Sequence, residues 1–269
     1  MRTTIDLTLD QDQTAVDALA EASGLPKQRI KDAMAKGACW WTVKGKQVRL
    51  RKAKREVKAG TRLQLFYDDA VLARKPEPAA LLEDFGRYSV WFKPNSMLAQ
   101  GSQWGDHCSL LRWAEVSLKK PCFLIHRLDA GAAGLMLIAH DAKAAGALSQ
   151  LFSGRSVSKV YQARVSGLLE ANDRIVDAPV EGKAAVSHIT TLALDDQQQT
   201  TLLRVRIETG RKHQIRRHLA GIGHPILGDR LYGKAAPVPL QLLAWLLEFD
   251  CPIFRRRVSF RLPDGHRLQ

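Results

Sequence analysis

Cysteine is scarce in this chain, and its placement does not suggest a metal or redox site. The 269 residues include four cysteines, and no two have the short spacing of a zinc-binding or redox pair. The four are Cys39, Cys108, Cys122 and Cys251. We therefore expect ordinary core or surface thiols, and we predict no metal site.

Long hydrophobic runs are also missing. No stretch of eighteen apolar residues occurs, and such a stretch is needed for a membrane-spanning helix. The start Met-Arg-Thr-Thr-Ile-Asp lacks the charged and then apolar layout of a secretion signal. Residues 6–21 carry several acids, whereas transit peptides are poor in acid. We expect a soluble, cytoplasmic protein with no membrane partner.

Negative charge is in short supply as well. Lys and Arg number 41 against 27 Asp and Glu, which gives a formal net charge of +14. An excess of this size favours a polyanionic partner, and RNA or DNA is a better fit than an anionic membrane. The length suits a large domain with a smaller one beside it.

Residues 1–70 are predicted to form the smaller domain. Thr14 and Asp17 have the spacing of a capping box at the start of a helix that ends at Gly24. Pro26 suits the first turn of a second helix, which carries Lys27 and Arg29 on its surface.

Basic residues crowd the strand-like segment 44–62. Nine Lys and Arg stand there against one acid, and the set includes Arg49, Arg51 and Lys52. Such a segment is either a solvated face that aids solubility or a surface that contacts phosphates, and the second is favoured. Two short helices followed by basic strands resemble the S4 RNA-binding module, which implies a small N-terminal α/β RNA-binding domain.

Residues 71–80 are predicted to be a linker, because closely spaced prolines favour an extended spacer. Residues 81–269 then form the larger domain. Strands are expected at 122–125, 135–139, 160–165 and 202–207, and helices at 109–118, 143–152 and 211–220. Apolar and charged residues alternate over 202–208, which predicts a sheet covered on one face. The fold class is therefore α+β, with a mostly antiparallel mixed sheet.

Several motifs follow one another in the larger domain. They are Lys93-Pro94, His-Arg-Leu-Asp at 126–129 with Gly-Leu-Met-Leu-Ile-Ala at 134–139, Ser-Lys-Val-Tyr-Gln-Ala-Arg-Val-Ser-Gly at 158–167, Gly-Arg-Lys-His-Gln-Ile-Arg at 210–216 and His-Pro-Ile-Leu-Gly-Asp at 224–229. In this order they resemble the RluA-type pseudouridine synthases, from about residue 88 to 233.

The resemblance implies an enzyme that turns a uridine of RNA into pseudouridine without a metal, cofactor or redox centre. It implies that Asp129 is the catalytic residue, as a nucleophile, as a carboxylate that stabilises charge at C1′, or as a group in proton transfer. Tyr161 corresponds to the active-site tyrosine of the family, which stacks on the base or transfers a proton. Arg216 corresponds to the basic partner of the aspartate, and we predict a bidentate contact with Asp129.

Other residues receive roles from their position near these motifs. Ile215 is expected to form an apolar wall of the pocket, and Gly134 belongs to a small-residue loop that lets the substrate approach. Arg127 is expected to contact phosphate or to fill the gap left by a flipped nucleotide. Backbone binding, with a solubility role as the alternative, is predicted for Lys159, Arg211, Lys212 and Arg217.

The chain departs from the family pattern at Ala132-Ala133, where Thr-Ser is usual. The rival interpretation is a non-catalytic RNA-binding or ribosome-assembly factor that uses the same fold, and the trio Asp129, Tyr161 and Arg216 argues against it. The S4-like segment favours ribosomal over transfer RNA as the substrate. A monomer is expected.

Overall fold

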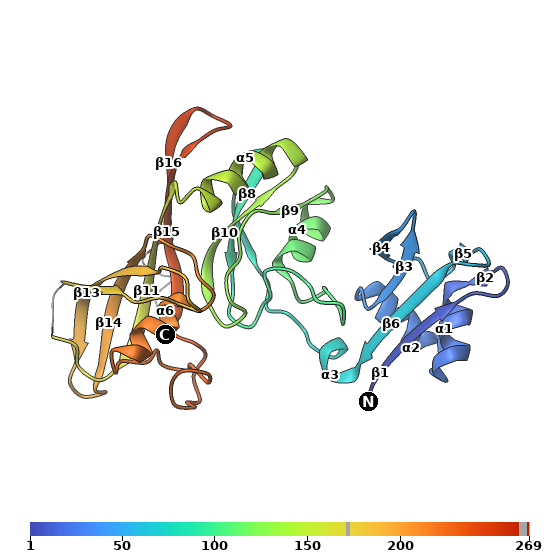
Figure 1. The fold of residues 1–269 in the computed structure, drawn as a ribbon, viewed down its shortest axis with the longest axis horizontal. Coiled ribbons are helices and arrows are strands. Elements are labelled where there is room, and N and C mark those ends of the chain that lie inside the picture. Colours follow the sequence, from blue (N-terminus) through green and yellow to red (C-terminus); the bar gives the residue numbers. More distant parts are fainter. Residues whose placement is uncertain (171–172, 264–267, 269) are drawn as a thin grey trace. The chain divides into compact units, whose positions relative to one another are not determined.

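The computed structural model describes residues 1–170, 173–263 and 268, and the chain divides into two compact units (Figure 1). The N-terminal unit contains Met1–Pro76 and Gln100–Trp113. The large unit contains Glu77–Ala99 and Ala114–Gln269. The chain therefore passes between the two units three times.

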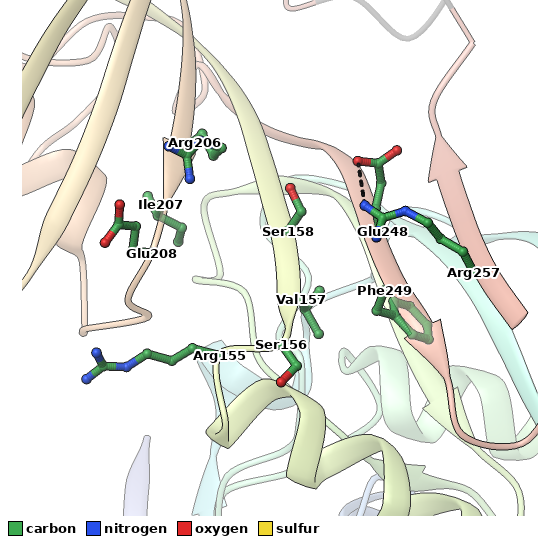
Figure 2. A pocket seen from close by; sticks show the side chains of 10 residues that line it. All are labelled: Arg155, Ser156, Val157, Ser158, Arg206, Ile207, Glu208, Glu248, Phe249 and Arg257. Atoms are coloured by element: carbon green, nitrogen blue, oxygen red, sulfur yellow. Dashed lines mark ion pairs between the residues drawn. The ribbon is translucent and has the colours of Figure 1, made fainter. Parts of the chain in front are cut away.

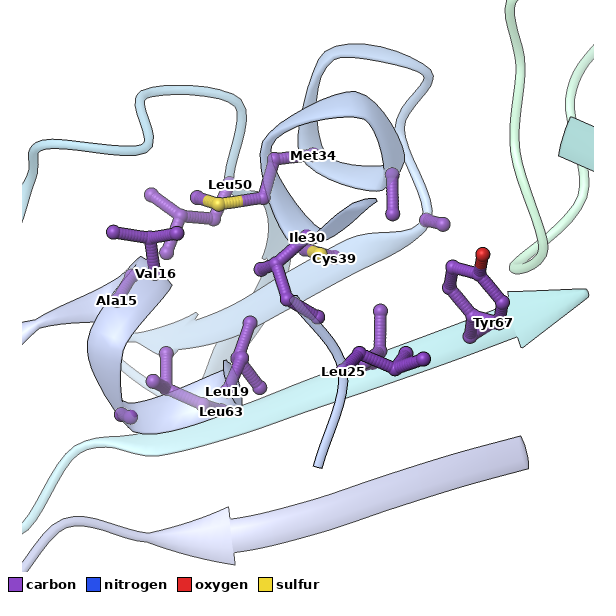
Figure 3. Close-up of a cluster of buried hydrophobic side chains, with 14 of the residues drawn as sticks. Ala15, Val16, Leu19, Leu25, Ile30, Met34, Cys39, Leu50, Leu63 and Tyr67 are labelled. Carbon is purple, nitrogen blue, oxygen red and sulfur yellow. The ribbon is translucent and has the colours of Figure 1, made fainter. Parts of the chain in front are cut away.

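The N-terminal unit is a four-stranded antiparallel sheet with two nine-residue helices and a third helix of four residues. The sheet order is β1-β6-β3-β4, and a short β2-β5 ribbon lies beside it. Its elements are β1 (Arg2–Thr8), β2 (Gln13–Thr14), α1 (Ala15–Ser23), α2 (Lys27–Ala35), β3 (Cys39–Val43), β4 (Lys46–Arg49), β5 (Glu56–Val57), β6 (Arg62–Asp68) and α3 (Asp69–Leu72). Both long helices place their apolar residues against the sheet, as Leu19, Ile30 and Leu63 show in Figure 3.

The predicted helix starts in this unit are confirmed. The Thr14 hydroxyl oxygen accepts a hydrogen bond from the backbone N–H of Asp17, and Gly24 ends α1 in the left-handed conformation. Pro26 stands directly before α2. The buried stripe of α2 leaves Lys27 and Arg29 on the exposed side.

The predicted domain boundary needs a correction at Gln100–Trp113, which the sequence pattern placed in the larger domain. Asp106 forms ion pairs with Arg49, at 3.2 Å from its Nε, and with Arg51. The Trp104 ring lies edge-on to Phe66, with 5.7 Å between ring centroids. Proline spacing marks the first crossing between the units, but it carries no signal for a later segment that returns through side-chain contacts.

The large unit is built on a ten-stranded sheet with the order β12-β13-β14-β11-β15-β10-β8-β7, to which β16 and β9 add at β15 and β10. Its strands are β7 (Ala80–Asp84), β8 (Tyr88–Lys93), β9 (Phe123–Leu124), β10 (Ala133–Ala139), β11 (Val157–Ser166), β12 (Asp173–Asp177), β13 (Val186–Asp195), β14 (Thr200–Ile207), β15 (Leu242–Cys251) and β16 (Arg256–Arg261). Only β10 and β15 pair in parallel within the described strands. The predicted α+β class with a mostly antiparallel mixed sheet is confirmed.

Buried and exposed residues alternate along β14, as predicted. Leu203, Val205 and Ile207 are buried, while Arg204 and Arg206 are exposed. The buried side packs against Ile215 and Leu219 of α6. No helix in the described ranges is long and apolar enough to cross a membrane.

Three further helices lie close to their predicted positions, and the first of them contains the chain's third crossing between the two units. They are α4 (Leu110–Leu118), α5 (Ala142–Ser153) and α6 (Gln214–Gly221). Helix α6 begins three residues later than predicted, because His213 adopts a left-handed conformation with a φ of 56°. The Gln214 side chain accepts hydrogen bonds from the Thr209 hydroxyl and the Arg211 N–H, which holds this turn in front of the helix.

Gly134 has a structural role that differs from the predicted one. It lies in β10 between Lys93 of β8 and Ala244 of β15, with a φ of +122°, and it does not line the active-site pocket described below. A side chain at this position would overlap the backbone of Ala244, whose N would lie 2.6 Å from the new Cβ. The glycine permits the close parallel approach of β10 and β15.

We expect Gly134→Ala to lower the free energy of unfolding by about 3–5 kcal/mol, from backbone strain plus overpacking. Thermal and urea unfolding would measure this loss. Gly146→Ala is the matched control, since Gly146 lies in α5 with open space around it. That change should stabilise the protein by about 0.5–1 kcal/mol. Equal effects at both positions would contradict the close-approach role of Gly134.

Candidate active site

A pocket in the large unit brings together most of the residues singled out by the sequence motifs. Asp129 follows β9 and its turn precedes β10, Tyr161 lies on β11, and Arg216 lies on α6. The pocket is lined by Arg127, Leu128, Asp129, Ala132, Tyr161, Ile207, Gly210, Arg211, His213, Gln214, Ile215, Arg216 and Leu242. Three segments that are distant in sequence therefore converge on one carboxylate.

Asp129 presents a partly exposed carboxylate at this pocket. Its side chain is 28% exposed, and its Oδ2 lies 3.2 Å from Nη1 of Arg216 and 3.7 Å from Nε2 of His213. Both contacts involve Oδ2, and Oδ1 has no hydrogen-bond partner within the described part of the chain. One oxygen is thus held, while the other is available to a substrate.

Arg216 contacts Asp129 differently from the prediction. Its bidentate partner is Asp229, which accepts from Nε at 2.7 Å and from Nη2 at 2.8 Å, and Asp129 receives a single hydrogen bond. Asp229 is the more favourable partner because its side chain is fully buried and fixed by the backbone N–H groups of Leu231 and Tyr232. The predicted two-pronged contact with Asp129 is wrong, although the two residues do meet.

Burial and hydrogen bonding act in opposite directions on the pKa values of the buried pair Asp229 and Arg216. Burial alone would raise the pKa of Asp229, but the hydrogen bonds from Arg216 and from two backbone N–H groups outweigh it and lower that pKa. The hydrogen bonds with Asp229 raise the pKa of Arg216, and Asp129 adds to this rise. Asp129 and Asp229 therefore share the guanidinium of Arg216, and Asp229 holds two of its three contacts.

His213 stands beside the carboxylate at the start of α6. Burial lowers its pKa, while the charge of Asp129 acts in the opposite direction. Its Nδ1 lies 3.0 Å from the hydroxyl of Tyr232, which fixes the ring. The neighbouring histidines do not form a metal site: within the described ranges, no three His, Cys, Asp or Glu side chains are arranged to hold a metal ion.

Tyr161 forms one wall of the pocket. Burial raises the pKa of its phenol, and the nearby Asp129 carboxylate adds to the rise. The phenol therefore stays protonated at neutral pH, so it can donate a hydrogen bond or stack but is a poor base. Ile215, buried on α6, supplies an apolar wall at the same pocket.

Two side chains hold the loop that carries Asp129. The buried Lys93 Nζ donates to the carbonyls of Pro94 at 2.9 Å, Met97 at 2.8 Å and Ala130 at 3.3 Å. Burial lowers the pKa of Lys93 to about 7, against the opposing influence of Asp129. Asn95 donates to the carbonyl of Gly131 at 2.6 Å. The loop is thus anchored through its backbone, without the two hydroxyls that are usual at Ala132-Ala133.

His126 contacts β10 and α5, next to the loop that carries Asp129. Its Nε2 accepts a hydrogen bond from the Leu137 N–H at 3.0 Å, and its ring stacks on Phe152 with 4.1 Å between centroids. Burial lowers its pKa to about 3, so the ring is neutral and its acceptor nitrogen remains available to Leu137.

The residues around the pocket that are predicted to bind the RNA backbone differ in their exposure and in their protein partners. Arg127 and Lys212 are exposed, and Arg211 is half-buried with its Nε donating to the Ala184 carbonyl. Arg217 is paired with Glu181 at 2.7 Å. Lys159 is 7% exposed and lines a second pocket behind Tyr161. A buried lysine of this kind is poorly placed for a phosphate on the surface.

In the N-terminal unit, the basic residues are also of two kinds. Arg49 and Arg51 are engaged by Asp106, and Arg49 also stacks on Trp40 at 4.1 Å. These two residues therefore hold the unit together. Lys52 and Arg29 are exposed, and Lys27 is exposed but paired with Asp17.

Sequence reasoning missed Asp229, His213 and Lys93 as parts of the site. Asp229 ends the His-Pro-Ile-Leu-Gly-Asp motif, and that carboxylate was the available signal for a second partner of Arg216. His213 lies within the Gly-Arg-Lys-His-Gln-Ile-Arg motif, and Lys93 begins the Lys-Pro pair.

Comparisons with known proteins identify one family. The family model for RNA pseudouridylate synthase matches residues 87–221. A dual-specificity RNA pseudouridine synthase RluA of Vibrio vulnificus is 31% identical over 196 residues, covering 66% of this chain and 75% of that protein. A ribosomal large subunit pseudouridine synthase D of Nitrosomonas europaea is 37% identical over 154 residues, covering 48% of this chain but only 44% of that protein.

Among solved structures, human RNA pseudouridylate synthase domain containing 1 matches with a TM-score of 0.62 at 20% identity. The match covers 71% of this chain and 87% of that chain, and at this identity it concerns the fold. The family match spans β8 to α6 and so includes Asp129, Tyr161 and Arg216. The chain belongs to the RNA pseudouridylate synthase family and resembles its RluA-type members.

Proposed function

We propose that this protein isomerises a uridine of RNA to pseudouridine at the pocket around Asp129. The observation that carries the proposal is the state of that carboxylate. Arg216 and His213 flank Oδ2, and Oδ1 faces no protein partner among the described residues. A carboxylate that is oriented but still open on one oxygen suits attack at, or charge stabilisation of, a sugar carbon.

The proposed reaction needs no external reactant. The bond from N1 of uracil to ribose C1′ breaks, the base turns within the pocket, and a bond from C5 to C1′ forms. The proton lost from C5 is balanced by one gained at N1. Asp129 acts as the nucleophile, as a stabiliser of positive charge at C1′, or in proton transfer, and all three roles use the same open oxygen. Tyr161 stacks on the base or donates a hydrogen bond to it.

The target uridine must leave its stack, because a stacked base hides both C1′ and C5. Arg127 is exposed at the rim of the pocket, two residues before Asp129 in the sequence. We assign it to the phosphate of the flipped nucleotide or to the gap left in the RNA. Lys212 is exposed and precedes His213 of the pocket in sequence, and we assign it to the flanking RNA backbone.

Ribosomal RNA is the proposed substrate, with transfer RNA as the alternative. The N-terminal unit has the two helices and basic strands that resemble an S4 RNA-binding module, and the Nitrosomonas relative is named for the large ribosomal subunit. We place the protein in the cytoplasm as a monomer. Within the N-terminal unit, the exposed Arg29 and Lys52 are the residues proposed to touch RNA.

A non-catalytic RNA-binding or ribosome-assembly factor is the competing function. Such a protein would use the positive charge of the chain but would not need a carboxylate flanked by Arg216 at the end of a pocket. Asp229, fully buried and bidentate on Arg216, adds a cost that a pure binder has no reason to retain.

Mapping pseudouridine in RNA treated with the protein would decide between these functions. Ribosomal and transfer RNA from a strain that lacks the protein would be incubated with it, and modified positions would be mapped. We expect at least one new pseudouridine, in ribosomal RNA. Binding without any new site in either RNA would support the non-catalytic function, and a new site only in transfer RNA would correct the substrate.

A further inference from the structure

The large sheet carries a positively charged surface on the side opposite the pocket. Residues that face each other across an antiparallel pair lie on the same side of a sheet. Arg206 is opposite Val160, Val160 is opposite Leu246, and Leu246 is opposite Arg261. Tyr161 and Ile207, which line the pocket, alternate with these residues and face the other way. We call Arg164, Arg204, Arg206 and Arg261, together with Trp245, the arginine face.

Trp245 organises this surface. A register shift between β11 and β15 occurs where Val160 pairs with Leu246 and Tyr161 with Ala244, which leaves Trp245 as the extra residue of a bulge. The guanidinium of Arg261 lies 4.7 Å from the Trp245 ring centroid, and that of Arg204 lies 6.0 Å from it. Stacked guanidinium groups are preorganised and lose less freedom when their N–H groups meet an anion.

Acidic residues on this surface are bound by neighbouring side chains. Asp173 lies in the same row as Arg204, through Thr190, and accepts a hydrogen bond from the Thr190 hydroxyl at 2.7 Å. Glu208 is 2.6 Å from Nε2 of His188, and Glu248 accepts a hydrogen bond from Ser259 at 2.9 Å. Arg204 and Arg206, which are exposed on β14, have no ion-pair partner within the described residues. The charges of Arg204 and Arg206 are therefore open to an external anion.

A recess lies at the end of β14, next to Arg206 of the arginine face, and Figure 2 shows the side chains that line it. It has a volume of about 490 Å³ and includes Arg155, Arg206 and Arg257, with Glu208 and Glu248 between them. Ile207 lines both this recess and the pocket around Asp129. An RNA strand that leaves the pocket would therefore pass Ile207, at the end of β14, to reach the arginine face.

We propose that the arginine face binds the phosphodiester backbone of RNA at a second site, away from the reacting uridine. The proposal rests on the proposed function in taking RNA as the ligand. Arginine is the residue best matched to phosphate, because its planar fork donates two parallel hydrogen bonds. The face adds affinity for RNA that extends beyond the modified nucleotide, and it takes no part in the reaction at Asp129.

The test compares two double variants of the full chain with the same loss of charge. Arg204→Gln with Arg206→Gln removes two arginines of the face, and Lys75→Gln with Lys143→Gln removes two exposed lysines elsewhere. Affinity for a uridine-containing RNA hairpin would be measured by fluorescence anisotropy between about 50 and 200 mM salt, where counterion release is informative. Thermal unfolding would establish that each variant is folded.

We expect the arginine variant to bind more weakly and to show a shallower salt dependence. Loss of two phosphate contacts should reduce the slope of log K against log salt by about 1.4–1.8. The lysine variant should keep the slope of the unmodified protein, and Arg204→Lys with Arg206→Lys should restore it. Equal slopes in the arginine variant and the unmodified protein, or equal losses in both double variants, would overturn the proposal.

Product formation at saturating RNA would separate this inference from the proposed function. The arginine variant should retain the turnover rate of the unmodified protein, because no residue of the face lines the pocket. If the unmodified protein binds RNA but forms no pseudouridine, the proposed function fails, while the slopes still decide whether the arginine face contacts phosphate. A loss of turnover at saturating RNA in the arginine variant alone would contradict a binding role.

Discussion

Asp129→Asn should abolish pseudouridine formation while RNA binding persists. The substitution keeps the size of the side chain and removes the charged oxygen that attacks or stabilises C1′. Loss of a group that acts directly on the reacting atoms lowers turnover on the order of 10⁴-fold or more. RNA affinity should not fall, since the change removes a negative charge from a surface that meets phosphates. Single-turnover assays and direct binding would measure the two effects separately.

The fold should survive this substitution because of Asp229. Arg216 keeps its bidentate contact with Asp229 when Asp129 loses its charge, so no buried guanidinium is left unpaired. Asp129 is also partly exposed, which limits the cost of the change. Thermal unfolding should therefore show a small shift. Full activity of Asp129→Asn would refute the role of Asp129 in all three of its proposed forms.

Local patterns in the sequence predicted most of the large unit. Alternation along 202–208 identified β14 and its buried side, and helix signals placed α4 and α5 within one residue at each end. These patterns succeed because each depends on residues that are close in sequence. The motifs around Asp129, Tyr161 and Arg216 likewise predicted which segments converge on the pocket.

The failures involve contacts between distant residues. Nothing local indicates that Asp106 binds Arg49 and Arg51, so the sequence pattern places Gln100–Trp113 in the larger domain and predicts phosphate contacts for both arginines. The sequence pattern places Gly134 in a small-residue loop that admits the substrate, whereas the approach of Ala244, more than a hundred residues away, determines its role. Competition between two carboxylates for one guanidinium is decided by burial, which periodicity does not report.

Asp229→Asn should damage both stability and turnover, because Asp229 determines how Arg216 meets Asp129. In the native arrangement Nε and Nη2 of Arg216 are occupied by Asp229, and only Nη1 reaches Asp129. Removing one partner from a buried ion pair costs about 3–5 kcal/mol. Asp129 remains as a partner for Arg216, so we expect about 3 kcal/mol, or a fall in Tm of roughly 6–12 °C.

Asp141→Asn is the matched control for stability. Asp141 also forms a bidentate pair in the large unit, with Nε of Arg87 at 2.8 Å and Nη2 at 2.7 Å, but these side chains are 40% and 43% exposed. Asparagine can still cap α5 at this position. Exposed ion pairs contribute little to stability, so the control should barely change the Tm. Similar losses in both variants would mean that burial of Asp229 is not the cause.

The effect of Asp229→Asn on turnover follows from the freed guanidinium. Without Asp229, Arg216 can turn both of its prongs toward Asp129, which ties up the oxygen that the native site leaves open and lowers the reactivity of the carboxylate. The turnover rate should fall while the affinity for RNA stays unchanged, because Asp229 is buried and cannot touch RNA. A variant that loses stability but keeps its turnover rate at a temperature where it is folded would show that Asp229 supports the fold alone. A fall in both, with binding intact, would identify Asp229 as the positioning residue that keeps one oxygen of Asp129 free.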